Sequence, residues 1–199
     1  MLLLLMLIIS YLAGSVNISI VLFKLLGKDD PRKGYSGNAG TTNVYRQAGP
    51  GWAALVLLLD VGRAVAVSLI ARYALEPGSV PWAGLALVAG NRFPCFHGFQ
   101  GGKGVANYLG FTAALSPAGA MVACIAWAVV YVVKRVPYIA SFAMIAVLGI
   151  ATSFALDNRP GAVLGALTTV LFIIANHWSN INGSPGRIKE DSAEDDDNV

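Results

Sequence analysis

The chain has 199 residues, of which 56% are hydrophobic and only 13% charged, and its formal net charge is +3. Charged residues are about half as frequent as in an ordinary soluble domain, so a soluble fold is excluded. The small positive charge and the acidic C-terminal segment argue against a nucleic-acid partner.

Apolar segments follow one another along the chain, and several reach the ~17–25 residues needed to cross a bilayer. The predicted spans are Leu2–Phe23, Gly51–Leu75, Val80–Ala89, Val105–Leu115, Ala118–Val133, Tyr138–Leu156 and Gly161–Ala175. The third and fourth are too short to cross without help from their neighbours. The first lacks a basic segment before it and a small-residue cleavage site, which predicts a retained span. We therefore predict an all-α integral membrane protein with seven transmembrane helices, some of them short.

Cations decide the predicted orientation. If the C-terminus is inside, eleven of the fourteen Lys and Arg residues fall on the cytoplasmic side, as the positive-inside rule requires. The N-terminus is then outside and the C-terminus cytoplasmic. Residues 1–182 form one polytopic membrane domain in this prediction. Residues 183–199 form a polar, acidic cytoplasmic tail, predicted to be disordered.

A glycine-rich stretch interrupts the hydrocarbon between the third and fourth spans. Residues 98–104 read Gly-Phe-Gln-Gly-Gly-Lys-Gly. Glycine lets backbone N–H groups approach an anion, and Lys103 supplies a charge. The stretch is not a Walker A loop, because Gly104 stands where Ser or Thr would bind magnesium. Spacing alone leaves two interpretations open: a phosphate site, or a tight turn between helices with a lysine reaching the interface.

Other polar residues are predicted on the same cytoplasmic side. The run Ser36–Asn43 is rich in small hydrogen-bonding residues and is followed by Arg46, which could fork onto a phosphate. Ordinary turn chemistry is the alternative for this run. His177 ends the last span and is either a site residue or an interfacial histidine. Asp60 and Arg63 lie three apart within the second span and are predicted to pair on one helix face.

The sequence offers no sign of a metal or cofactor. Its two cysteines, Cys95 and Cys124, have no metal-ligand spacing. Nucleophile-elbow and Asp-rich magnesium motifs are also lacking from the sequence. A cationic site rich in Ser and Asn is suited to positioning phosphate-bearing substrates and stabilising their charge.

Three stretches resemble the motifs of the PlsY family, bacterial membrane acyltransferases that use acyl-phosphate and glycerol 3-phosphate. The family's first motif is Ser-Gly-Asn-Pro-Gly-Ala-Thr-Asn-Val-x-Arg, and residues 36–46 read Ser-Gly-Asn-Ala-Gly-Thr-Thr-Asn-Val-Tyr-Arg. The second is Gly-His-x-Phe-Pro-x-Phe-x-x-Phe-Lys-Gly-Gly-Lys-Gly-Val-Ala, and residues 90–106 read Gly-Asn-Arg-Phe-Pro-Cys-Phe-His-Gly-Phe-Gln-Gly-Gly-Lys-Gly-Val-Ala. The third begins His-Arg-x-Asn-Ile, against His-Trp-Ser-Asn-Ile at residues 177–181.

The resemblance implies transfer of an acyl group from acyl-phosphate to the 1-hydroxyl of glycerol 3-phosphate, giving lysophosphatidic acid and phosphate. It implies catalytic roles for His177, Lys103 and Asn180. It also implies that backbone amides in residues 36–40 and 101–104 assist. The substrate-binding residues implied are Ser36, Gly37, Asn38, Gly40, Thr42, Asn43, Arg46, Gly101, Gly102, Gly104 and Ser141. The resemblance also implies that the protein lies in the cell's inner membrane, surrounded by lipid, with its site on the cytoplasmic face. The implied partner is an enzyme that produces acyl-phosphate.

The chain departs from the family pattern within the motifs and after the third motif. Asn91 replaces a histidine, Ala39 a proline and Gln100 a lysine, and a Gly- and Pro-containing run follows Ile181. These changes remove charge near the predicted site. They leave an alternative from another class: a non-catalytic or altered-specificity relative, or a small membrane transporter that binds phosphate or lipid.

Overall fold

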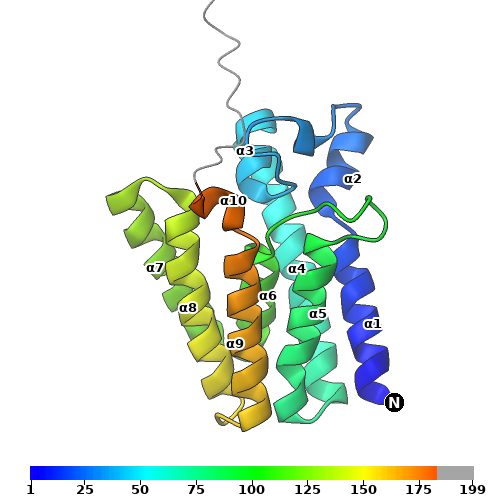
Figure 1. Cartoon of the computed structure of the whole chain (residues 1–199), viewed down its shortest axis with the longest axis vertical. Helices are drawn as coiled ribbons and strands as arrows, with labels where there is room; N and C mark the ends of the chain where they lie inside the picture. Colours follow the sequence, from blue (N-terminus) through cyan, green and yellow to red (C-terminus); the bar gives the residue numbers. More distant parts are fainter. Residues whose placement is uncertain (183–199) are drawn as a thin grey trace, which may run out of the picture.

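The computed structural model describes residues 1–182, and within that range all regular secondary structure is helical (Figure 1). The predicted tail lies outside the described residues. The α-helices are α1 (Leu2–Ser15), α2 (Ile18–Leu25), α3 (Thr41–Ala48), α4 (Pro50–Ala74), α5 (Val80–Arg92), α6 (Val105–Leu115), α7 (Pro117–Lys134), α8 (Pro137–Ala155), α9 (Pro160–Ala175) and α10 (Trp178–Ile181). Two 3₁₀ turns, η1 (Pro31–Lys33) and η2 (Pro77–Ser79), precede α3 and α5.

Proline sets where several helices begin. α4, α7, α8 and α9 each start at a proline, whose fixed φ suits the first helical position and whose missing N–H is not needed there. Ser116 caps α7 by accepting a hydrogen bond from the Gly119 amide at 3.2 Å. The predicted spans match α4, α7, α8 and α9 to within a residue at each end, and α6 coincides with its predicted span, whereas α5 extends beyond its predicted end at Ala89 to Arg92.

The predicted first span, Leu2–Phe23, corresponds to the apolar segment Leu2–Leu25, which is divided into two helices. α1 ends at Ser15 and α2 begins at Ile18, because the Asn17 side chain accepts a hydrogen bond from the Ile20 amide (3.3 Å) and starts a new helix. The Asn17 amide also reaches the Ala39 carbonyl at 3.4 Å. The polar segment between the first two predicted spans contains a further helix, α3, which packs on α4.

The long helices stand side by side, and the polar segments gather at one end of them (Figure 1). The N-terminus lies at the opposite end of the molecule from α3 and α10, and the loop between α5 and α6 lies with them (Figure 1). The loops predicted to share one side of the membrane thus share one end of the molecule.

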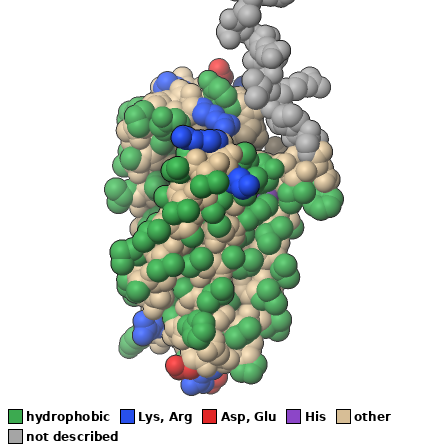
Figure 2. Space-filling model, turned by 90° about the vertical axis from the view of Figure 1, so that its left-hand side faces the viewer, with side chains coloured by type: hydrophobic (Ala, Val, Ile, Leu, Met, Phe, Trp, Pro, Cys, Tyr) green, Lys and Arg blue, Asp and Glu red, His purple; other side chains and the backbone are tan. Residues whose placement is uncertain are grey.

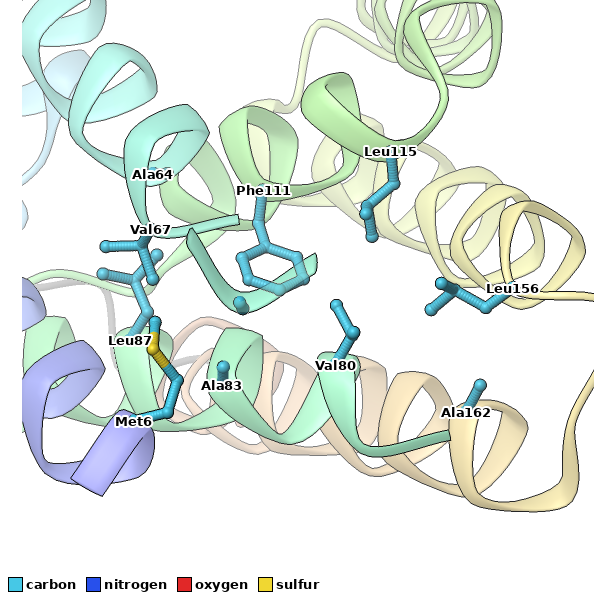
Figure 3. Close-up of a cluster of buried hydrophobic side chains, with 11 residues drawn as sticks. Met6, Ala64, Val67, Val80, Ala83, Leu87, Phe111, Leu115, Leu156 and Ala162 are labelled. Carbon is cyan, nitrogen blue, oxygen red and sulfur yellow. The ribbon is translucent and has the colours of Figure 1, made fainter. Parts of the chain in front are cut away.

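The main apolar core joins α1, α4, α5, α6 and α9 away from this polar end. Phe111 of α6 lies between Val67 of α4 and Val80 of α5, and Met6 enters from α1 (Figure 3). Phe111 is fully buried, and Met6 is 3% exposed. Burial of these side chains fixes how the helices pack around α6.

Helices α1 and α5 meet at two glycines. A Cβ atom placed on Gly14 would lie 2.0 Å from the Leu87 carbonyl oxygen, and one on Gly90 would lie 2.0 Å from that of Tyr11. Close backbone contact at small residues is the usual way for helices to associate in a membrane, where apolar burial drives them together only weakly.

Apolar side chains cover the flank of the molecule between two charged ends (Figure 2). Exposed hydrophobic residues of the helices include Leu4, Leu58, Met121, Val132 and Phe154. Four helical segments of the described chain, Leu2–Leu25, α4, α7 and α8, are long and apolar enough to cross a membrane. An apolar belt around such helices is the surface of an integral membrane protein.

Candidate active site

A cavity of about 670 Å³ opens among the loops at the polar end and extends down between α4, α6, α7 and α8. Its polar part is lined by side chains and backbone of the three motif segments. Its lower arm is apolar: the lining residues there are Ala53, Ala54, Leu57, Leu109, Cys124, Trp127 and Met144. The cavity can therefore hold a ligand with a polar head and an apolar tail.

Lys103 is held at the polar part of this cavity by two asparagines. Its ammonium group donates to the Asn180 side-chain oxygen, and its carbonyl accepts from the Asn176 amide at 3.3 Å. Burial, and to a smaller extent the nearby Arg92 charge, lowers the pKa of Lys103 to about 8. An anion in the cavity would favour the charged form further, because an opposite charge stabilises the ammonium ion.

His177 is 3% exposed and lines the same cavity. Its Nδ1 lies 2.8 Å from the Ile173 carbonyl oxygen, so Nδ1 carries the proton and Nε2 is left as an acceptor. The Phe142 ring packs edge-on against the imidazole, with centroids 5.3 Å apart. Burial lowers the pKa of His177 to about 4, and the charges of Lys103 and Arg92 act in the same direction. The imidazole is therefore neutral at physiological pH.

Two helices present their N-termini to the cavity. Gly40 and Thr41 at the start of α3, and Gly104 and Val105 at the start of α6, are among the lining residues. The first N–H groups of a helix lack partners within it and carry its positive dipole end, which suits an anion. Gly104 has a φ of 92°, and a Cβ atom on it would lie 2.4 Å from Val88, so glycine is required where α6 begins.

The sequence indicated that the backbone amides of the glycines before Lys103 bind an anion, but Gly101 and Gly102 use theirs to hold the loop. The Gly101 amide donates to the Arg92 carbonyl (3.1 Å) and the Gly102 amide to the Asn91 carbonyl (2.9 Å). These two N–H groups are thereby committed to the end of α5, where they fix the loop that carries Lys103. Gly102 still lines the cavity, whereas Gly101 and Gly37 lie outside its lining.

The first motif also divides into lining and supporting residues. Ser36, Asn38, Thr42 and Arg46 line the cavity. Asn43 lines it too, but its amide donates to the Pro31 carbonyl at 2.7 Å and the Gly34 carbonyl at 3.2 Å, so this group holds the loop in shape.

Ser141 completes the predicted set. It lies on the cavity wall, one turn into α8. Its hydroxyl donates to the Pro137 carbonyl of its own helix at 3.0 Å, which leaves the hydroxyl oxygen free to accept.

Sequence reasoning missed the residues that join the motif segments. Arg32 donates to the carbonyls of His97 and Gln100, at 2.7 Å each, while Asp30 binds the rest of its guanidinium. Asn91 is 4% exposed, lines the cavity and contacts Asn17. The sequence shows only that these residues are polar and lie among apolar segments, which does not identify the groups to which they hydrogen-bond.

The predicted pairing of Asp60 with Arg63 is confirmed, with an N–O distance of 2.7 Å. Asp60 also lines the cavity, and the same guanidinium nitrogen binds the Asn107 side-chain oxygen at 2.8 Å. The pair therefore lies at the cavity wall, close to the start of α6.

A family model described as Glycerol-3-phosphate acyltransferase matches residues 4–184. The glycerol-3-phosphate acyltransferase of Neisseria meningitidis serogroup B is 36% identical over 87% of this chain and 88% of its own. That of Azotobacter vinelandii is 38% identical over 88% of this chain and 92% of its own.

Two solved structures are also similar to this chain. The crystal structure of PlsY (YgiH), an integral membrane glycerol 3-phosphate acyltransferase, in its glycerol 3-phosphate form is similar with a TM-score of 0.82 and 34% identity over 90% of both chains. Its lysophosphatidic acid form gives a TM-score of 0.80.

Proposed function

Because the chain belongs to the glycerol-3-phosphate acyltransferase family and is an integral membrane acyltransferase, we propose that its acyl donor is acyl-phosphate and its product lysophosphatidic acid. The observation that carries this proposal is the cavity itself. Its polar part combines Lys103, Arg46 and two helix N-termini, and it continues into an apolar arm. A phosphate attached directly to an acyl chain matches that combination.

Phosphate binding is assigned to the cationic side of the cavity. Lys103 neutralises the phosphate of the acyl donor, and Asn180 holds the lysine in place through its side-chain oxygen. The N–H groups at the start of α6 lie beside the lysine in the chain and supply further donors. Arg46 is exposed at the cavity and holds the phosphate of glycerol 3-phosphate.

The reaction joins the 1-hydroxyl oxygen of glycerol 3-phosphate to the carbonyl carbon of the acyl-phosphate. The bond from that carbon to the phosphate oxygen then breaks, and inorganic phosphate leaves. His177 accepts a hydrogen bond from the attacking hydroxyl at Nε2, the nitrogen that Ile173 leaves free. An imidazole whose pKa is about 4 holds a proton poorly, so the proton passes to an oxygen of the leaving phosphate.

The cellular setting follows from the same assignment. Seven crossings place the N-terminus outside and the motif segments on the cytoplasmic face of the inner membrane. The position of the N-terminus at the end opposite α10 supports this topology (Figure 1). A separate enzyme must produce the acyl-phosphate, since the cavity binds this donor ready-made.

The test uses purified full-length protein with palmitoyl phosphate and glycerol 3-phosphate. We expect lysophosphatidic acid and inorganic phosphate to form in equal amounts, and Lys103→Met to lower the rate about 10²–10³-fold, the effect of losing a donor to developing charge. Lys134→Met, an exposed lysine at the end of α7, is the matched control and should change nothing. Failure of wild type to form lysophosphatidic acid would refute the proposed donor, and an active Lys103→Met would refute the site.

A further inference from the structure

The wall of the cavity next to α6 carries a buried polar group outside the three motif roles. One guanidinium nitrogen of Arg63 donates both to Asp60, at 2.7 Å, and to the Asn107 side-chain oxygen, at 2.8 Å. The other donates to the carbonyl of Val16, at the break between α1 and α2. Asp60 is 7% and Asn107 1% exposed. Arg63 thus ties α4, α6 and the α1–α2 break together.

This contact settles which way the Asn107 amide points. A guanidinium group has only donors, so the atom of Asn107 next to Arg63 must be its oxygen. The amide nitrogen of Asn107 is then turned away from Arg63, and within residues 1–182 no side chain or carbonyl accepts from it. Asn107 lines the cavity. This N–H donor is therefore open to an acceptor on a ligand in the cavity.

The position of Asn107 indicates which atom of a ligand would accept this hydrogen bond. The residue lies in the first turn of α6, after the N-cap Gly104 and before Leu109 of the apolar arm. An acyl-phosphate has its groups in the same order: phosphate, carbonyl, chain. A phosphate at the start of α6 with its chain beside Leu109 places the carbonyl next to Asn107.

We propose that the Asn107 side-chain amide donates a hydrogen bond to the carbonyl oxygen of the acyl donor, an inference that rests on the proposed function. When the glycerol hydroxyl oxygen bonds to the carbonyl carbon, the π electron pair moves onto this oxygen. It returns as the bond to phosphate breaks. Asn107 stabilises the negative oxygen in between, as donors do in other acyl transfers.

Arg63 and Asp60 are positioning residues in this arrangement. The charge of Asp60 would oppose a negative oxygen nearby, and the adjacent Arg63 charge offsets it. With these two charges offset, the group presented to a ligand in the cavity is the oriented amide of Asn107. The forked guanidinium is needed for this, because one nitrogen serves two acceptors while the other binds Val16.

The experiment compares Asn107→Asp with wild type under the assay already described. The aspartate keeps the size of the side chain and an oxygen for Arg63, but it has no donor. We expect kcat to fall about 10²-fold, with KM for both substrates and the Kd of a non-reactive acyl phosphonate changed less than about 3-fold. Arg63→Lys should lower kcat about 10-fold, because the fork that orients the amide is lost. Thr112→Val is the control: Thr112 is buried on the same helix, bonds Thr152 and does not line the cavity.

Each outcome decides the inference. If Asn107→Asp does not fold, Asn107→Ala carries the same expectation without adding a charge. An aspartate or alanine variant that keeps more than about a third of wild-type kcat overturns the inference and leaves the proposed function standing. A raised KM for glycerol 3-phosphate with unchanged kcat also overturns it, because the amide would then bind the acceptor. Only an inactive wild type refutes the proposed donor as well.

Discussion

Around Phe111 the helices are held by apolar side chains and by backbone contact at glycine, whereas around Lys103 the loops are held by individual hydrogen bonds. In the first region the contacts of Met6, Val67 and Val80 are non-directional and shared among neighbours (Figure 3). In the second, Arg32 joins two loops through the carbonyls of His97 and Gln100. Each such link depends on one side chain.

The difference shows where each region is vulnerable. Apolar packing tolerates a change of shape as long as volume is kept, because no single contact is required. A hydrogen-bonded loop loses its position when one donor is removed, and the buried partner is left unsatisfied. The two regions should therefore respond to mutation differently: steric insertion damages the packed region, and removal of a polar group damages the site.

The largest effect should come from adding one methyl group where α1 meets α5. In Gly90→Ala the new Cβ would lie 2.0 Å from the Tyr11 carbonyl oxygen, and backbone cannot yield as a side chain can. We expect a loss of about 3 kcal/mol or more, at the upper end for overpacking, seen as a lower unfolding temperature in detergent. Gly62→Ala, with nothing within 4 Å of its new Cβ, is the control. Equal stability of the two variants would contradict the role of close helix contact.

A smaller effect is expected from pH, and it concerns the polar region alone. The pKa of Lys103 is about 8, so its charge is present below that pH and is lost as pH rises through it. We expect kcat/KM to fall up to tenfold per pH unit above about 8, since kcat/KM follows the free enzyme. His177 stays neutral down to about pH 4 and should add no loss between pH 5 and 7.

Lys103→Arg separates this lysine from other titrating groups. An arginine stays charged throughout the accessible range, so the decline above pH 8 should move beyond pH 10 in this variant. A decline that stays at the same pH would mean that another group, on the protein or the substrate, causes it.

The smallest effect is expected at Gln100, where the chain departs from the family pattern. Its side chain is exposed and does not line the cavity, and only its carbonyl is used, by Arg32. Gln100→Lys should therefore change kcat and KM less than about 2-fold, as exposed substitutions away from structural contacts usually do. Asn91→Ala should lower activity more, because Asn91 is buried at the cavity and contacts Asn17. Steady-state kinetics with both substrates distinguishes these results, and a larger change at Gln100 would place that residue in the site.

The sequence alone determined most of the long helices and the segments that form the site. Hydropathy is a local property of consecutive residues, so α4 to α9 could be predicted nearly to their ends, helped by prolines at their starts. The three motifs could be read because the residues of each are contiguous. Counting the cations on each side of the predicted membrane placed three segments on the same side, those that hold Lys103, Arg46 and His177.

Only the tertiary structure decided how these parts are joined. Asn17 breaks the first span and reaches Ala39, twenty-two residues on. The Gly102 amide bonds Asn91 instead of facing the cavity. The orientation of the Asn107 amide depends on Arg63, forty-four residues earlier. Hydrogen bonds between distant residues leave no period in the sequence, because a polar side chain in an apolar span shows that a partner is needed but not which one.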